Sequence, residues 1–319
     1  PNRLDKTGDD ILPYIRYRLG AIYDESGGQL DIAYSEPECT PGDTPAPETN
    51  TKRCFPVIWA PPGREEPITD WFHKYVVTSV TQVDRTGLAP DMVTKYQYLG
   101  DAAWHFDDDD GLTKQKYKTW SQWRGYGQVR TFSGSHDDPS TQTDTFYLRG
   151  MDGDRKTKDG GTKSVTVSDG EGGTHTDHNS LAGFVLKTVT YTKPDGAVHS
   201  KTVNTPWRVK TAERERSWGT ATAEVVRTGA SHTWTAKDGG GWIETKTETE
   251  YAESGPGVGR VVSVNDLGDV TTSTDDKCTR TTYADNTGAH MVDFPSREET
   301  VSVACSVTPD LSKHVISDV

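Results

Sequence analysis

Aliphatic side chains are scarce in this sequence. Hydrophobic residues occupy 32% of the 319 positions, and the mean hydropathy is -0.75. A compact globule of this size normally contains more Val, Ile, Leu and Phe, so one dense apolar core is not expected. No stretch approaches the roughly 18 consecutive apolar residues that a membrane-spanning helix needs, and we predict no membrane span.

Basic residues are also fewer than acidic ones. The chain has 35 Lys and Arg residues against 48 Asp and Glu residues, which gives a net charge of -13. Nucleic acids and anionic membrane surfaces would be repelled by this excess. We therefore exclude both as main partners.

Cysteine is limited to four residues, which form two couples close in the sequence, Cys39 with Cys54 and Cys278 with Cys305. Cys-x-x-Cys is absent and no histidine lies at zinc spacing beside them, which argues against a zinc site. Each couple brackets a loop with few other core residues, so we predict two local disulfides in an exported protein. Four reduced thiols in a cytosolic protein are the alternative.

The sequence shows no initiating Met, because it begins at Pro1, and no recognisable signal peptide. We expect it to be processed or excised from something longer. No interdomain linker stands out in the composition. We therefore predict that residues 1–319 form one continuous segment, with a loop-rich N-terminal subregion at residues 1–70.

Aromatic and β-branched residues are abundant instead. The chain contains 9 Trp, 13 Tyr and 7 Phe, and no segment keeps a 3.6-residue apolar period. Alternation with a period of two is clearest in Trp242–Tyr251, which has one charged face and one face rich in Thr. Turns such as Lys193-Pro-Asp-Gly196 separate the strand-like runs. The pattern predicts an all-β fold, an irregular series of antiparallel hairpins forming a large curved, spiralling sheet.

The ends of such a sheet are unpaired strands that can associate with other chains. We expect these edges near Tyr14–Tyr23 and Arg297–Val303, because both segments hold alternating apolar residues. Residues 36–53 contain four prolines, and residues 152–161 and 168–178 are rich in Gly and polar residues. We expect all three segments to be mobile loops.

One motif resembles a known family. Trp123-Arg-Gly-Tyr-Gly-Gln-Val129 is similar to the aromatic-Arg-Gly-aromatic-Gly-x-Val signature of RHS/YD-repeat proteins, and Gly259-Arg-Val261 resembles the opening of a YD repeat. Tyr283-Ala-Asp-Asn286 resembles its closing element. Similarity to actinobacterial RHS-repeat proteins is found in Cys278–Thr287, Phe294–Ser296, Cys305, Cys54–Trp59 and Asp70–Val77. The positions that carry the resemblance are Trp123, Arg124, Gly125, Tyr126, Gly127, Gly259, Asp266, Gly268 and Tyr283.

This family contains the shell component of insecticidal toxin complexes, polymorphic RHS toxins and teneurins. The resemblance implies a structural, non-enzymatic segment of a YD-repeat β shell that is secreted or displayed at the cell surface. The implied partners are flanking segments of the same larger polypeptide and a C-terminal toxin cargo. The family's self-cleaving aspartate motif has no counterpart in Asp310–Val319, so self-cleavage is not expected here.

Two other classes of function stay open. A carbohydrate-binding or adhesion module, with a cell-surface glycan as partner, would be favoured if aromatic side chains were exposed in a row. The tryptophans considered for stacking on sugars are Trp104, Trp120, Trp123 and Trp207. A polysaccharide-acting enzyme would need two carboxylates in one cleft, and no pair can be assigned among 48 acidic residues.

The remaining polar clusters have ordinary interpretations. Asp107, Asp108, Asp109 and Asp110 could form a calcium loop, but they lack the alternation and distal Glu of an EF-hand, so a solvated acidic loop is favoured. His175-Thr-Asp-His178 offers three metal ligands but no fourth. No Gly-x-Ser-x-Gly nucleophile motif occurs. We therefore predict no catalytic residues, no cofactor and no metal.

Overall fold

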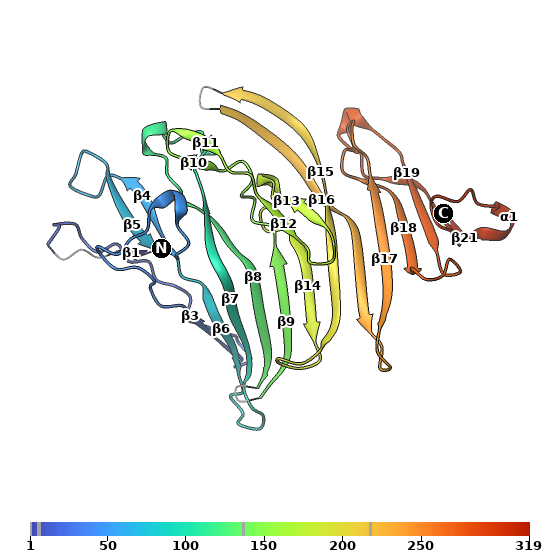
Figure 1. The fold of residues 1–319 in the computed structure, drawn as a ribbon, viewed down its shortest axis with the longest axis horizontal. Coiled ribbons are helices and arrows are strands. Elements are labelled where there is room, and N and C mark those ends of the chain that lie inside the picture. The colour runs from blue at the N-terminus through green and yellow to red at the C-terminus, as the bar shows by residue number, and fades with distance from the viewer. Residues whose placement is uncertain (1, 5–7, 136–137, 217–218) are drawn as a thin grey trace. The chain divides into compact units, whose positions relative to one another are not determined.

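The computed structural model describes residues 2–4, 8–135, 138–216 and 219–319. Strands account for 53% of the chain and helices for 5%, which confirms the all-β prediction. Fourteen strands form one antiparallel sheet (Figure 1). By the contacts between its residues, the chain divides into two compact units.

The first unit comprises Pro1–Phe184 and Thr190–Ala197. Its strands in the main sheet are, in spatial order, β2 (Ala21–Tyr23), β3 (Gln29–Tyr34), β6 (Val77–Val83), β7 (Met92–His105), β8 (Gln122–Ser135) and β9 (Pro139–Tyr147). A three-stranded sheet has the order β1 (Asn2–Arg3), β5 (Ile68–His73) and β4 (Cys54–Trp59). Short elements complete the unit: hairpins β10 (Arg155–Thr157) with β11 (Gly160–Thr162) and β12 (Thr166–Ser168) with β13 (Thr174–Thr176), and 3-10 helices η1 (Pro47–Thr49), η2 (Gln115–Tyr117) and η3 (Asn179–Leu181).

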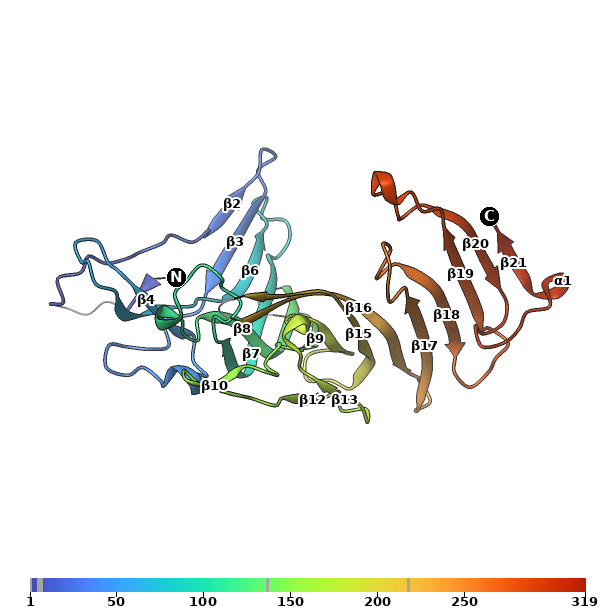
Figure 2. The ribbon, with the colours of Figure 1, turned by 90° about the horizontal axis from the view of Figure 1, so that it is seen from above.

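The second unit comprises Val185–Val189 and Val198–Val319. Its strands, in spatial order, are β14 (Val185–Tyr191, whose last two residues belong to the first unit), β15 (Val198–Arg216), β16 (Gly219–Ala236), β17 (Trp242–Tyr251), β18 (Val261–Asp269), β19 (Lys277–Tyr283), β20 (Pro295–Val301) and β21 (Val315–Asp318). Figure 2 shows β17 to β21 side by side in this order. Its helices are η4 (Thr287–Ala289) and α1 (Leu311–His314).

Of the two expected sheet edges, the N-terminal one is confirmed, because the main sheet begins with β2, and the C-terminal one needs correction. Of Tyr14–Tyr23, only β2 at the C-terminal end is a strand. Arg297–Val303 is not the last strand, because β20 pairs with β21, with Thr300 opposite Ser317. The Asp310 carboxylate accepts a hydrogen bond from the Ser312 N–H at 3.1 Å and caps helix α1, which turns the chain back toward β20.

Two of the three segments expected to be mobile loops also form hairpins, β10-β11 and β12-β13. Asp169 organises the second of them, because its carboxylate accepts the N–H groups of Glu171 and Gly173. Asp24 does the same with Ser26 and Gly28 in the turn between β2 and β3. One acidic residue therefore orders each five-residue turn.

Apolar packing is concentrated in two clusters of the first unit. One consists of Leu4, Cys39, Cys54 and Trp71, and it contains the Cys39–Cys54 disulfide. The other consists of Trp104, Phe106 and Trp120, with Phe55 and Trp123 packed against it. The second cluster attaches the small sheet to one end of β7 and β8, because it joins Phe55 of β4 to Trp104 of β7 and Trp123 of β8.

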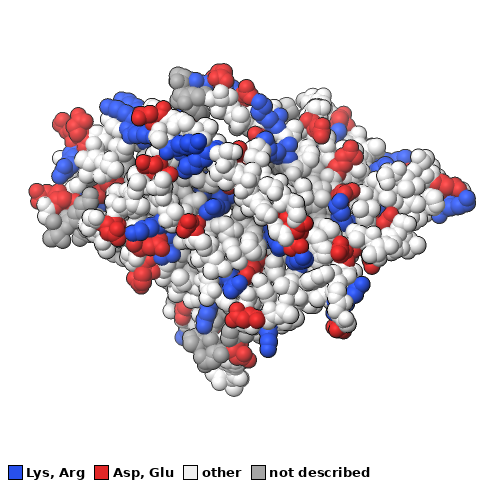
Figure 3. Space-filling model, viewed as in Figure 1, with Lys and Arg blue, Asp and Glu red and all other residues white. Residues whose placement is uncertain are grey.

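Elsewhere the sheet carries hydroxyl pairs across neighbouring strands. Thr202 and Thr233 join β15 to β16 with their Oγ1 atoms 2.8 Å apart, and Thr279 and Thr300 join β19 to β20 at 3.0 Å. Such cross-strand pairs stabilise a sheet whose faces stay partly wet. On the face shown in Figure 3, Lys and Arg side chains are interspersed with Asp and Glu.

The structure contains the Cys278–Cys305 disulfide as well as Cys39–Cys54, which is the pairing that the sequence predicts. Among the residues that the structure describes, no helix has the length and apolar character to span a membrane.

The turn between β6 and β7 should respond to acid. The Asp84 carboxylate accepts hydrogen bonds from the Thr86 hydroxyl and from the N–H groups of Thr86, Leu88 and Ala89. These bonds, the Thr86 hydroxyl first, lower the pKa of Asp84 from 3.8 to about 2. Because the folded pKa is depressed, the carboxylate stabilises the turn fully above about pH 4, and this contribution is lost as the pH falls through the folded pKa.

An NMR titration of the Asp84 carboxyl carbon measures this directly, and we expect a midpoint near 2. A midpoint near 4, as for an unperturbed aspartate, would show that the turn is not held in this way.

Candidate functional site

The motif that carries the family resemblance lies on strand β8, where β8 pairs with β7. Trp123 packs edge-on against Trp104, with ring centroids 4.8 Å apart, and the pairing register shifts between Ala103 and Trp104. Gly125 lies opposite Ala103 with a φ of 73°, a conformation that residues with a Cβ rarely adopt. The glycine lets β8 follow this irregularity, which bends the strand pair.

Arg124 and Tyr126 of the same motif tie loops to the sheet. The Arg124 guanidinium donates to the side-chain oxygen of Asn179 at 2.6 Å, and burial lowers its pKa. Tyr126 is 7% exposed, accepts a hydrogen bond from the Arg53 guanidinium at 3.3 Å, and packs on Tyr98 with centroids 5.1 Å apart. The motif therefore has a structural role in this chain.

The glycines of the motifs are not equivalent. A Cβ on Gly127 would meet only a flexible side chain, 3.8 Å away, so space does not require glycine there. Gly259 has a φ of 82°, and a Cβ would lie 2.6 Å from Cγ1 of Val225, so this position does require glycine. Gly268 is the second-last residue of β18, and its N–H donates to the Asp266 carboxylate at 3.2 Å.

A recurring contact closes four strand pairs. In each, a tyrosine on the second strand donates its hydroxyl to a backbone carbonyl on the first strand or just before it, and we call this contact a tyrosine clasp. The four clasps are Tyr34 to Leu19 (3.0 Å), Tyr98 to Val77 (2.8 Å), Tyr251 to Thr228 (2.8 Å) and Tyr283 to Val261 (2.8 Å).

The clasps share one register. In β6 and β7, Ser79 pairs with Lys95, which places Gln97 opposite Val77, and Tyr98 lies one position beyond. The registers of β2-β3, β16-β17 and β18-β19 give the same offset of one residue. The phenolic ring thus crosses diagonally to the neighbouring strand, within reach for a long aromatic side chain.

The last clasp has an additional ion pair. The Arg260 guanidinium lies over the Tyr283 ring, 4.3 Å from its centroid, and Nη1 is 2.5 Å from the Asp285 carboxylate. The hydrogen bond and charge of Arg260 lower the pKa of Asp285. Tyr283 and Asp285 therefore fasten the end of β19 to the start of β18 together.

The four consecutive aspartates have separate partners within the chain. Asp107 accepts from the Ser121 hydroxyl, Asp108 pairs with Arg155, Asp109 accepts from Asn179, and Asp110 accepts from the Leu112 and Thr113 N–H groups. Burial raises the pKa of Asp107. The four carboxylates are thus directed to different donors instead of one shared ion position.

His175 and His178 likewise lie near two different carboxylates. His175 lies 3.2 Å from the Asp169 carboxylate, and His178 lies 3.9 Å from Asp152. Within the described parts of the chain, no group of three or more His, Cys, Asp or Glu side chains could hold a metal ion.

The four tryptophans considered for stacking on sugars do not form an exposed row. Trp104 and Trp120 are each 3% exposed, Trp123 is partly buried against their cluster, and Trp207 packs on Tyr251 with centroids 4.9 Å apart.

Of the clasp tyrosines, the sequence motifs had pointed only to Tyr283. Three of the four are followed two positions later by an acidic residue, at Glu36, Glu253 and Asp285, and this spacing could have identified them.

No protein-family model matches the chain, and no curated protein matches it. Solved structures with a similar fold include TcdB2-TccC3 (11% identity, TM-score 0.45, covering 89% of this chain and 15% of that chain) and TcdB2-TccC3 without its hypervariable C-terminal region (12%, 0.45, 75% and 13%). A Tc holotoxin pore of Photorhabdus luminescens is also similar (10%, 0.47, 89% and 15%). The chain thus spans about one seventh of the length of these solved chains.

Proposed function

We propose that this chain is a non-enzymatic wall segment of an RHS/YD-repeat β shell. The observation that carries the proposal is the tyrosine clasp, which recurs with one register on four strand pairs in both units. A repeated hairpin with a repeated closing contact is how a long sheet is built from units that cannot bury a core alone. The Trp123–Val129 motif and the hydroxyl pairs between strands fit the same role.

In this role the chain adjoins further segments of a larger polypeptide, and the shell encloses a C-terminal toxin cargo or contacts a cell surface. Two disulfides support an exported protein, because such bonds persist in oxidising compartments. The actinobacterial origin rests on the sequence resemblance alone.

A screen against glycoside, ester and peptide substrates tests the non-enzymatic part of the proposal. We expect no turnover, because Asp107 to Asp110, His175 and His178 are held by hydrogen bonds and ion pairs within the chain. Turnover that disappears when one pair of carboxylates is mutated would replace the shell proposal with an enzyme.

The clasps should contribute to stability additively. Replacing Tyr98, Tyr251 or Tyr283 with phenylalanine removes one partly buried hydrogen bond, which costs about 1 kcal/mol of unfolding free energy each. Urea unfolding of the single and triple variants measures this. Tyr17→Phe is the control, since Tyr17 is 98% exposed, and it should leave the midpoint unchanged. Equal midpoints for the triple variant and wild type would refute a structural role of the clasps.

A further inference from the structure

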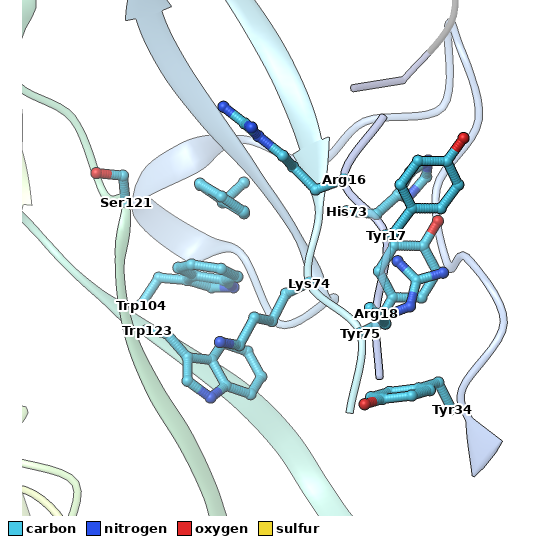
Figure 4. A pocket seen from close by; sticks show the side chains of 11 residues that line it. Arg16, Tyr17, Arg18, Tyr34, His73, Lys74, Tyr75, Trp104, Ser121 and Trp123 are labelled. Carbon is cyan, nitrogen blue, oxygen red and sulfur yellow. The ribbon is translucent and has the colours of Figure 1, made fainter. Parts of the chain in front are cut away.

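A pocket of about 400 Å³ lies in the first unit, between the small sheet and the end of β7 and β8. Figure 4 shows Trp104 and Trp123 on one side, with Lys74 reaching beside Trp123, and Arg18 between Tyr75 and Tyr34 on the other. The volume is in the lower part of the range of small-molecule sites. None of its lining residues is acidic.

The segment before β2 crosses this pocket and is anchored on both sides of it. The Tyr14 carbonyl accepts the Arg3 N–H at 3.0 Å, and the Arg16 N–H donates to the Asn2 side chain at 2.9 Å. Farther along, the Leu19 carbonyl accepts a hydrogen bond from the hydroxyl of Tyr34, one of the clasp tyrosines, at 3.0 Å. The segment therefore holds its basic side chains in place over the pocket instead of leaving them on a free tail.

The cations at the pocket lack acidic partners. Arg18 lies over the Tyr75 ring, 3.7 Å from its centroid, and 5.4 Å from that of Tyr34. Lys74 lies 5.7 Å from the Trp123 centroid. In the described parts of the chain neither Arg18 nor Lys74 forms a salt bridge, although acidic residues outnumber basic ones by 48 to 35. A local excess of positive charge inside an acidic protein attracts an anion.

One of the residues that line this pocket carries a buried polar atom without a partner. His73 lines it and is 8% exposed, and its Nδ1 has no hydrogen-bond partner. Burial lowers the pKa of His73, which favours the neutral ring. An unpaired buried nitrogen is costly. The phenol groups of Tyr17 and Tyr75 offer further neutral hydrogen-bonding groups at the rim.

We propose that this pocket binds the end of an acidic saccharide, a sugar ring that carries one carboxylate. Arg18 and Lys74 would bind the carboxylate, the His73 ring and the phenols would bind hydroxyls, and Trp123 would pack against the apolar face of the ring. A long polyanion is disfavoured, because the net charge of -13 would repel it. This binding function is independent of the shell proposal.

Calorimetric titration of the 319-residue chain with glucuronic acid and with glucose tests the proposal. We expect glucuronate to bind at least about tenfold more tightly than glucose, because only the acid uses the two cations. Arg18→Gln and Lys74→Gln should each weaken glucuronate binding about tenfold, with an unchanged circular dichroism spectrum. Lys193→Gln, an exposed lysine outside the pocket, is the matched control and should bind as wild type does.

Several outcomes would overturn the proposal. Equal affinity for glucuronate and glucose would remove the role of the cations, and absence of binding would remove the site. Inorganic phosphate that competes as well as glucuronate would reduce it to a general anion site. A blocked acidic dipeptide that binds more tightly than glucuronate would assign the pocket to a protein partner instead.

Discussion

Replacing both Cys278 and Cys305 with serine should destabilise the second unit by about 3.5 kcal/mol, the largest effect we expect from any local change. The disulfide closes a loop of 27 residues, and the loop-entropy model gives this magnitude. The unit has few other buried apolar side chains near it, chiefly Val301 and Ala304. Hydrogen exchange followed by mass spectrometry should show faster exchange throughout β18 to β20.

The other disulfide provides the matched control. Replacing Cys39 and Cys54 with serine opens a loop of 15 residues, worth about 3 kcal/mol, and it removes two members of an apolar cluster of the first unit. Exchange in β18 to β20 should stay at the wild-type rate in this variant. If instead the Cys278 and Cys305 replacement left exchange unchanged, the pairing would not support the second unit.

Replacing Asp144 with alanine should destabilise the first unit by about 3 kcal/mol. The carboxylate is 1% exposed and accepts hydrogen bonds from Arg130, Gln128 and Tyr191, at 2.7 to 3.2 Å. Burial alone would raise the pKa of Asp144, but the hydrogen bonds and charge of Arg130 outweigh it and lower the pKa. Removing one member of such a pair leaves the partly buried guanidinium uncompensated.

Thermal or urea unfolding, followed for the first unit, measures this cost. The control is Asp318→Ala, which breaks an ion pair with Arg297 whose two side chains are about half exposed, 47% and 50%. Solvent already screens that pair, so a small change is expected. An Asp144 variant no less stable than the Asp318 variant would contradict the assignment.

The sequence predicted the strand content, since alternation with a period of two does not depend on distant residues. It also predicted the disulfides, because each couple is close in the chain. It missed β21, whose four residues become a strand only by pairing with β20. The hairpin of β12 and β13 was missed for a similar reason, because its turn depends on one side chain, Asp169, accepting two N–H groups.

The pocket could not be predicted from the sequence. Its members come from separate parts of the chain, with Arg18, Lys74 and Trp123 brought together only when the small sheet packs against β7 and β8. The net charge of -13 gives no sign of it, because composition does not show where the basic residues gather. The clasp of Tyr98 likewise became apparent only once the strand registers were known, since no acidic residue follows Tyr98 two positions later.

Limited proteolysis of the longer polypeptide that contains this chain tests the central claim most directly. With the wild-type segment, we predict that a C-terminal cargo resists protease until the shell is unfolded. With the triple variant of Tyr98, Tyr251 and Tyr283, weaker hairpins should let protease reach the cargo earlier. A cargo that is digested equally fast in the wild-type polypeptide and as a free domain would contradict a shell.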